Sequence, residues 1–117
     1  MLNNISIGID IVDVKRFKQI PFKSKPGFYK KLFHKSEINY CLKYKNSYER
    51  FAGKFAIKEA VIKSIPDKIS MIDILTYHVK SKPYIKIKNL KKNYLFQVSL
   101  SHEHNLAVAV VLSELRV

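Results

Sequence analysis

The sequence predicts an α+β fold, with helices packed on an antiparallel sheet, from three observations. Helix-type patterns fill most of residues 14–64, whereas alternation of apolar and polar residues dominates residues 72–112. A separate strand pattern opens the chain at residues 5–12. Helices and strands that occupy different parts of a chain, instead of alternating, favour α+β over a parallel α/β sheet.

The composition is that of one small domain covering residues 1–117. Hydrophobic residues make up 47% of the chain, which is enough for one core and too many for a disordered protein. The single Cys41 excludes an internal disulfide and points to a reducing compartment. We expect no secretory signal at the N-terminus, and the longest apolar run, residues 106–112, is too short to span a bilayer. We therefore expect a cytoplasmic protein with no membrane association.

The net charge of +13 predicts a polyanionic partner. Nucleic acid, phosphorylated cofactors, acidic proteins and anionic lipid surfaces all meet this description. A lysine-rich composition that serves solubility alone would produce the same charge. The net charge therefore indicates that a partner would be negatively charged, but it does not distinguish among these classes.

The first strand, residues 5–12, contains two informative positions. Gly8 indicates that another element packs closely against the backbone there. Asp10 interrupts an apolar run near the end of the strand, so it is either a turn or cap residue or a ligand at the mouth of a site. Asp13 is then placed to cap a short basic helix over residues 14–19.

Three further helices are expected before the sheet. Helical spacing covers residues 28–33, and Ser36 precedes another helix over residues 37–43. Ser47 is a suitable N-cap for the longest helix, which includes residues 50–64.

The second half of the chain is expected to form mainly strands. Residues 72–79 and 83–87 predict a hairpin. Residues 90–94 predict a short helix, after which residues 96–102 and 106–112 predict two more strands.

The helix over residues 50–64 is apolar on nearly every side, which is typical of a buried helix. Glu59 and Lys63 are neighbours on it and lie among the apolar positions. A carboxylate in such surroundings needs a metal ion or a paired lysine, unless the two residues are an ordinary ion pair on a partly exposed seam. The helix has a single basic stripe, formed by Arg50, Lys54 and Lys58.

Asp10 and Glu59 together suggest a magnesium site. Two carboxylates suit a Mg²⁺ ion that keeps waters and bridges to substrate phosphates, and lysines suit those phosphates.

Other candidate sites lack residues that their chemistry requires. Ser101 and His102 are adjacent on a strand and point to opposite faces, which argues against a serine hydrolase. His102 and His104 lack a third zinc ligand, and no known nucleic-acid-reading motif is present.

Four segments resemble the holo-[acyl-carrier-protein] synthases, the small bacterial 4′-phosphopantetheinyl transferases. They follow the family order from residue 5 to residue 112, which is nearly the whole chain. The segments are Ile7-Gly8-Ile9-Asp10-Ile11 with Arg16, Phe33 with Glu37, Arg50-x-Ala52-Gly53-Lys54-Phe55-Ala56-x-Lys58-Glu59-Ala60-x-x-Lys63, and Val98-Ser99-Leu100-Ser101-His102-Glu103. The third segment together with the early Gly-x-Asp is the most specific part.

The resemblance implies the transfer of phosphopantetheine from coenzyme A to a serine of apo acyl carrier protein. This reaction belongs to fatty acid biosynthesis and leaves adenosine 3′,5′-bisphosphate. The resemblance also implies a Mg²⁺ cofactor bound by Asp10 and Glu59, and a homotrimer with its sites between neighbouring subunits. The serine proton would pass to Glu59 directly, or to a water that the metal or Glu59 holds.

The same resemblance implies the remaining roles. Lys63 would stabilise charge on the leaving phosphate, and Arg16 would face the acidic recognition helix of the carrier protein. Lys54, Lys58 and His102 would line the coenzyme pocket, although Lys54 stands where the family usually has arginine. The charge of +13 would then steer an acidic carrier protein, with no nucleic acid or membrane as partner. The alternative is a non-enzymatic basic domain that binds nucleic acid or an acidic protein.

Overall fold

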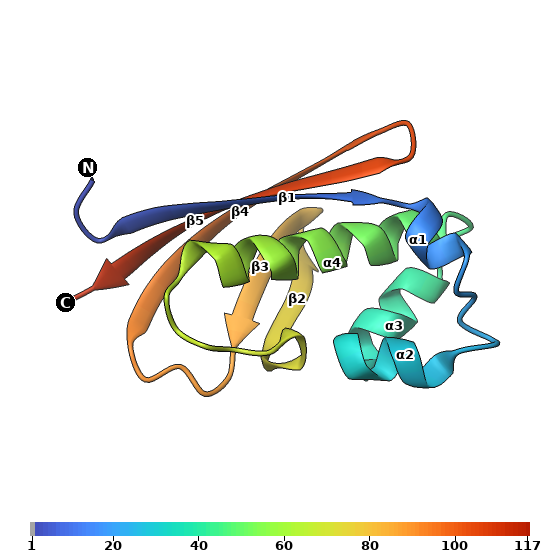
Figure 1. The fold of residues 1–117 in the computed structure, drawn as a ribbon, viewed down its shortest axis with the longest axis horizontal. Helices are drawn as coiled ribbons and strands as arrows, with labels where there is room; N and C mark the ends of the chain where they lie inside the picture. Colours follow the sequence, from blue (N-terminus) through green and yellow to red (C-terminus); the bar gives the residue numbers. More distant parts are fainter. Residues whose placement is uncertain (1) are drawn as a thin grey trace.

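The three longest strands form one antiparallel sheet in the computed structural model, which describes residues 2–117 (Figure 1). The strand order is β1-β5-β4, so the first strand of the chain pairs with the last and β1 and β4 are the two edges. The strands are β1 (Ile5–Asp13), β4 (Asn93–Glu103) and β5 (Leu106–Arg116). The predicted α+β class and its antiparallel sheet are confirmed.

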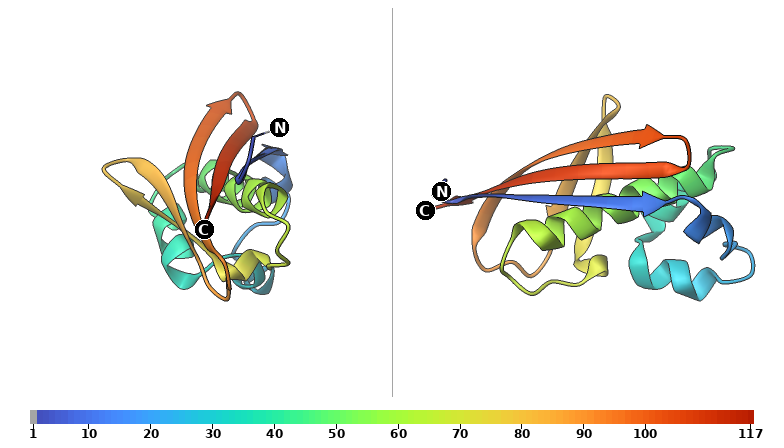
Figure 2. Two further views of the ribbon diagram at one scale, coloured as in Figure 1. Left: turned by 90° about the vertical axis from the view of Figure 1, so that its left-hand side faces the viewer. Right: turned by 45° about the horizontal axis from the view of Figure 1, so that its top comes forward.

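The long helix α4 (Ser47–Ser64) packs along one face of this sheet (Figures 1 and 2). Gly8 of β1 allows the close approach, because a Cβ at this position would collide with the carbonyl oxygen of Ala60. The close packing predicted from Gly8 is therefore confirmed. The side chains at this contact are small or branched: Ala60 of α4 and Val111, which pairs with Gly8, have no exposed surface.

Three short helices enclose an aromatic cluster beside the first half of α4. They are α1 (Lys15–Lys18), α2 (Pro26–Leu32) and α3 (Lys35–Leu42). Tyr29 is buried in this cluster, with its ring centroid 4.7 Å from that of Phe51. Its hydroxyl donates to the backbone oxygens of Phe17 at 3.1 Å and Ile20 at 2.6 Å. These bonds tie α2 to α1 and so fix α1 next to α4.

The strands β2 (Ile74–Val79) and β3 (Lys82–Ile87) form an antiparallel hairpin, which shares no strand pairing with the three-stranded sheet although β3 lies against β4 (Figure 2). Lys80 and Ser81 have φ values of 50° and 68°, the left-handed region that a tight two-residue hairpin turn requires. One turn of 3₁₀ helix, η1 (Met71–Asp73), precedes the hairpin. The predicted hairpin is present, with its first strand beginning later than expected.

Two predicted helix caps are wrong by a short distance. His34, rather than Ser36, is the N-cap of α3, because the His34 backbone N–H donates to Glu37 Oε1 at 2.7 Å. Asn46, rather than Ser47, precedes α4. Both differences shift the start of a helix without changing which helices form.

The short helix predicted over residues 90–94 does not form. Tyr94 instead pairs with Leu115 in the ladder between β4 and β5. Its hydroxyl also donates to Asp67 Oδ1 at 2.6 Å, which anchors the start of β4 to the loop after α4. Sheet pairing therefore overrides the local helical pattern.

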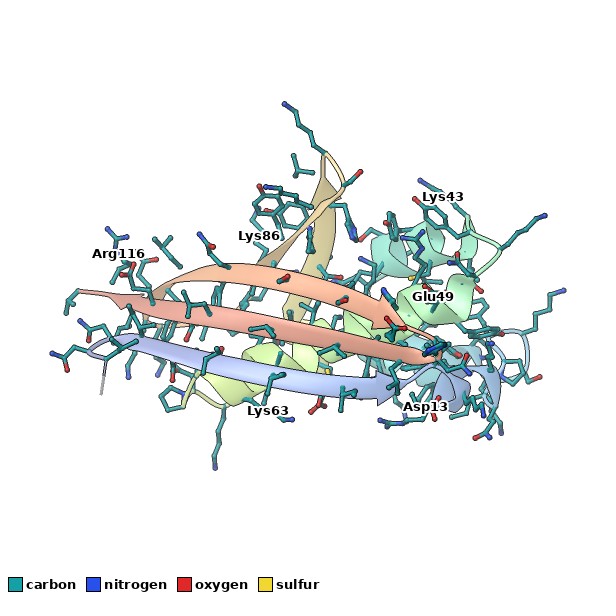
Figure 3. All side chains as sticks on the ribbon, turned by 90° about the horizontal axis from the view of Figure 1, so that it is seen from above. Asp13, Lys43, Glu49, Lys63, Lys86 and Arg116 are labelled. Atoms are coloured by element: carbon teal, nitrogen blue, oxygen red, sulfur yellow. The ribbon has the colours of Figure 1, made fainter. Side chains whose placement is uncertain are left out.

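The face of the sheet opposite α4 is apolar and carries no helix within residues 2–117, and it faces the viewer in Figure 3. Ile7, Ile9 and Ile11 of β1 are 65%, 59% and 59% exposed, and Leu95 and Leu112 extend the patch across β4 and β5. We call this surface the open sheet face. Within the same residues, no helix combines the length and apolarity that crossing a bilayer requires.

Candidate active site

Asp10 and Lys63 meet where β1 passes the last turn of α4. Lys63 Nζ donates to Asp10 Oδ1 at 3.0 Å and to the backbone oxygen of Ile9 at 3.0 Å. The side chain of Asp10 is 15% exposed and that of Lys63 is 51% exposed. The pair therefore lies at the surface along the β1 edge of the sheet, where Figure 3 labels Lys63.

Glu59 lies one helical turn before Lys63. Positions 55, 59 and 63 follow one another at four-residue spacing and form a less buried seam on α4, with Phe55 and Glu59 partly exposed. We call this row the α4 seam. Within residues 2–117 Glu59 forms no ion pair. The ordinary Glu59–Lys63 pair that the sequence allowed does not form, because Lys63 turns to Asp10.

The groups at this junction suit a hard divalent cation. Carboxylate oxygens of Asp10 and Glu59 are the ligands that Mg²⁺ prefers. The Lys63 ammonium already places positive charge against Asp10. Residues 2–117 contain no group of three or more acidic, histidine or cysteine side chains that could hold a metal. Two carboxylates still suit Mg²⁺, since this ion keeps several waters and takes further oxygens from substrate phosphates.

Arg16 extends the α4 seam in the other direction. It is exposed on α1, and its guanidinium carbon lies 5.1 Å from the centroid of the Phe55 ring. Phe55 precedes Glu59 by one helical turn. A basic group from α1 therefore lies at the end of the same row that contains Glu59 and Lys63.

Lys58 is in the core, away from this surface. Its side chain has no exposed area, and its Nζ donates to Glu37 Oε1 at 2.8 Å and to the Leu32 backbone oxygen at 2.7 Å. The other oxygen of Glu37 accepts from the backbone N–H of Thr76 at 3.0 Å. Burial lowers the pKa of Lys58, and Glu37 opposes that shift. The expected place of Lys58 in the coenzyme pocket does not match this geometry, because no surface of it is open to a ligand.

Lys54 is almost as buried, but it borders a hollow between α3 and β2. Its Nζ donates to Thr76 Oγ1 at 2.9 Å and lies 4.6 Å from the centroid of the Tyr40 ring. Burial is the main cause that lowers the pKa of Lys54. Tyr40, His78 and Lys43 line the same hollow.

Glu37 is the structural residue that sequence reasoning did not single out. It joins α3, α4 and β2 by accepting bonds from His34, Lys58 and Thr76. The only available signal was its place four residues after Phe33 in one matching segment. Spacing could not show that its partner would be Lys58, because the two residues are 21 positions apart.

His102 lies on β4, the opposite edge of the sheet from Asp10. Its Nε2 is 3.2 Å from the backbone oxygen of Glu49, and its ring packs against Gly53, so it sits at the first half of α4. Glu49 appears beyond the β4 edge in Figure 3. One chain therefore does not bring His102 to the Asp10–Lys63 pair.

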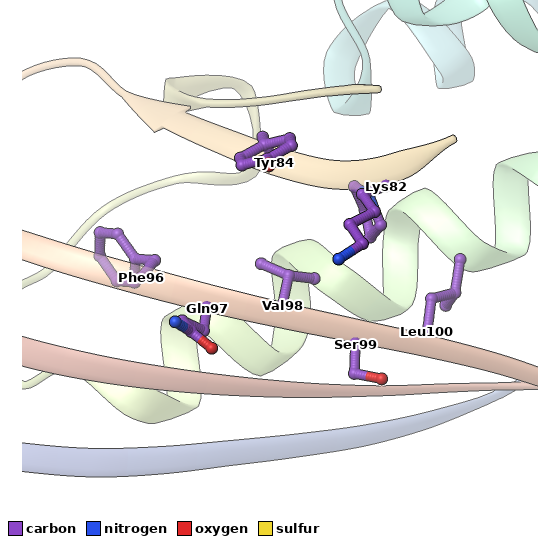
Figure 4. A pocket seen from close by; sticks show the side chains of 8 residues that line it. Lys82, Tyr84, Phe96, Gln97, Val98, Ser99 and Leu100 are labelled. Carbon is purple, nitrogen blue, oxygen red and sulfur yellow. The ribbon is translucent and has the colours of Figure 1, made fainter. Parts of the chain in front are cut away.

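A groove of about 480 Å³ also lies along the β4 edge (Figure 4). Its walls come from the start of β3 and the middle of β4. The residues that line it are Lys82, Pro83, Tyr84, Phe96, Gln97, Val98, Ser99 and Leu100. The β1 edge thus carries carboxylates and a lysine, and the β4 edge carries a groove and a histidine.

Comparison with known proteins is consistent with these features. The family model of the 4′-phosphopantetheinyl transferase superfamily matches residues 6–111. A holo-[acyl-carrier-protein] synthase of Mycoplasma capricolum is 40% identical over 116 residues, covering 97% of this chain and 96% of that protein. Another, from Thermodesulfovibrio yellowstonii, is 36% identical over 110 residues, covering 91% and 95%.

Solved structures agree in fold over most of the chain. The holo-[acyl-carrier-protein] synthase of Helicobacter pylori in complex with coenzyme A is 31% identical, with a TM-score of 0.78 over 92% of this chain and 99% of that one. The Bacillus anthracis enzyme in complex with CoA (3′,5′-ADP) is 28% identical, with a TM-score of 0.79 over 93% and 95%. With sequence, fold and the matched segments in agreement, the chain belongs to the holo-[acyl-carrier-protein] synthases of the 4′-phosphopantetheinyl transferase superfamily.

Proposed function

We propose that this chain, as one domain, transfers 4′-phosphopantetheine from coenzyme A to a serine of apo acyl carrier protein. The products are holo acyl carrier protein and adenosine 3′,5′-bisphosphate, and the reaction serves fatty acid biosynthesis. The observation that supports this most directly is that Asp10, Lys63 and Glu59, which forms no ion pair within residues 2–117, lie on one surface. The family match over almost the whole chain supports the choice of substrates.

Asp10 and Glu59 would hold Mg²⁺. When bound there, the ion would neutralise charge on the pyrophosphate of coenzyme A. Asp10 is held in place by the pairing of β1 with β5, opposite Ala109. Glu59 is held by α4, so the two carboxylates are presented by rigid elements.

Lys63 would stabilise the charge that develops on the leaving phosphate. The serine oxygen of the carrier protein attacks the phosphorus next to the pantetheine arm, and the bridging oxygen leaves with adenosine 3′,5′-bisphosphate. The serine proton passes to Glu59 directly or through a water that Glu59 holds. The partial exposure of Glu59 leaves it open to either route.

The remaining contacts divide between the two edges of the sheet. Arg16, exposed at the end of the α4 seam, would meet the acidic carrier protein, which the net charge of +13 would steer to this side. His102 would contact the coenzyme from the β4 edge, and Lys54 would contact it only through the hollow between α3 and β2 that it borders. Lys58 would support the site from the core, because it is fully buried.

We also propose a homotrimer. The open sheet face gathers five exposed apolar side chains, three of them isoleucines more than half exposed, and contiguous apolar patches often mark interfaces between proteins. His102 and Asp10 lie on opposite edges of one sheet, so a complete site requires the β4 edge of one copy near the β1 edge of the next. Light scattering on the purified protein tests this, and a monomer at micromolar concentration would contradict it.

A cytoplasmic location accompanies the proposal. Cys41 is the single cysteine and is buried, and burial raises its pKa to about 12. A buried thiol of this kind needs no oxidising environment and takes part in no disulfide.

Incubation with coenzyme A, Mg²⁺ and apo carrier protein tests the function, with the carrier-protein mass as the readout. We expect a mass increase equal to one phosphopantetheine, and loss of that increase when EDTA is added. Salt-sensitive binding to DNA without any transfer would instead favour a non-enzymatic basic domain.

A further inference from the structure

Lys63 occupies Oδ1 of Asp10, one of the two carboxylate oxygens through which Asp10 could bind a metal ion. Its ammonium is bonded to a carboxylate oxygen and to the backbone oxygen of Ile9, both at 3.0 Å. Oxygens of these two kinds are also ligands for hard divalent cations. A divalent ion at Asp10 would lie close to the Lys63 ammonium, and the repulsion between their positive charges weakens the binding of both.

The two members of this pair differ in how freely they can move. Asp10 is only 15% exposed and sits within the paired part of β1, so its position is set by the sheet. Lys63 is 51% exposed, has a long flexible side chain and lies one residue before the end of α4. Lys63 is therefore the member of the pair that is free to move toward solvent.

We propose that Lys63 is an internal competitor for the cation site at Asp10, which holds the carboxylate until a divalent ion and an anionic ligand arrive together. The ion displaces the ammonium from Asp10, and a phosphate then provides the displaced ammonium with a new partner. Metal and coenzyme A consequently favour each other's binding. The inference rests on the proposed metal site and adds to it the order in which Lys63 contacts first Asp10 and then a phosphate.

The metal alone is the probe that tests this, because no coenzyme is then present to rescue the displaced lysine. Mn²⁺ binding to the full chain is measured by the loss of the free-ion paramagnetic resonance signal. The variants are Lys63→Met, which removes the competing charge, and Lys63→Arg, which keeps it. Lys88→Met is the matched control, since it loses the same charge from an exposed lysine that forms no ion pair among residues 2–117.

We expect Lys63→Met to bind Mn²⁺ about fivefold or more tightly than the wild type. Lys63→Arg should bind no more tightly than the wild type, and Lys88→Met should stay within about twofold of it. A merely structural role for Lys63 would not produce tighter metal binding on its removal. Equal or weaker binding in Lys63→Met overturns the inference.

Asp10→Asn separates this failure from failure of the metal site itself. If Asp10→Asn abolishes Mn²⁺ binding while Lys63→Met leaves it unchanged, the metal site stands and competition by Lys63 is wrong. If neither the wild type nor Lys63→Met binds Mn²⁺, or if Asp10→Asn binds as well as the wild type, the proposed metal site fails and the inference fails with it.

Discussion

Lys58 and Lys63 lie five positions apart on one helix, yet their surroundings are opposite. Lys58 has no exposed surface and is held by Glu37 and a backbone oxygen, whereas Lys63 is half exposed and reaches Asp10 at the edge of the sheet. A buried pair has lost its water, so removing either partner leaves an uncompensated buried charge and destabilises the fold. An exposed pair can exchange its partner for a ligand at small cost. Burial, not residue type, therefore separates the structural lysine from the candidate catalytic one.

The residues at the surface junction should control activity without controlling stability. Asp10→Ala and Glu59→Ala should each reduce transfer by at least about 10³-fold, because each removes a proposed ligand of the ion that neutralises the transferring group. Carrier-protein mass spectrometry measures the rate, and circular dichroism checks the fold. Full activity in either folded variant would contradict the metal assignment.

The buried Glu37–Lys58 pair should instead control stability. Glu37→Ala should lower the free energy of unfolding by about 3–5 kcal/mol, since it leaves the ammonium of Lys58 buried without a counter-charge. Lys63→Met should change the same quantity by less than about 1 kcal/mol, because its pair is partly exposed. Urea unfolding measures both. Similar losses in the two variants would remove the distinction between the two lysines.

Arg16 should affect one substrate and not the other. Arg16→Ala should weaken carrier-protein binding about tenfold, more strongly at low salt, because the lost charge steers and holds an acidic partner. Coenzyme A affinity should stay at the wild-type value, which calorimetry with each ligand separately can measure. Equal losses of affinity for both ligands would instead assign Arg16 to the coenzyme site.

The smallest expected effect concerns Lys54 and pH. Burial lowers its pKa from the ordinary value of 10.5, so between the lowered value and 10.5 the unfolded chain binds more protons than the folded one. Its contribution to the free energy of unfolding therefore rises as pH rises through this window. Subtracting the Lys54→Met values from those of the wild type should isolate a difference that increases with pH, while Lys88→Met should follow the wild type. A flat difference would mean that Lys54 has its ordinary pKa.

Much of the fold was predictable from local pattern. Alternation identified the strands, and the glycine in β1 predicted a close contact, because a residue without a Cβ inside an apolar strand often marks the close approach of another backbone. The predicted helix over residues 90–94 was wrong because contacts with distant segments decide the structure there. There the pairing of Tyr94 with Leu115 and its bond to Asp67 come from distant segments, which no local window contains.

Sequence alone determined the family, the candidate residues and the sign of the partner's charge, since all three are carried by residue identity and order. Only the tertiary structure decided which charged groups meet. It put Lys58 with Glu37 in the core, Lys63 with Asp10 at the surface, and His102 on the far edge of the sheet. The physical reason is that an ion pair depends on a distance of a few ångströms, and residues far apart in the chain reach that distance only through packing of the helix against the sheet and the hairpin.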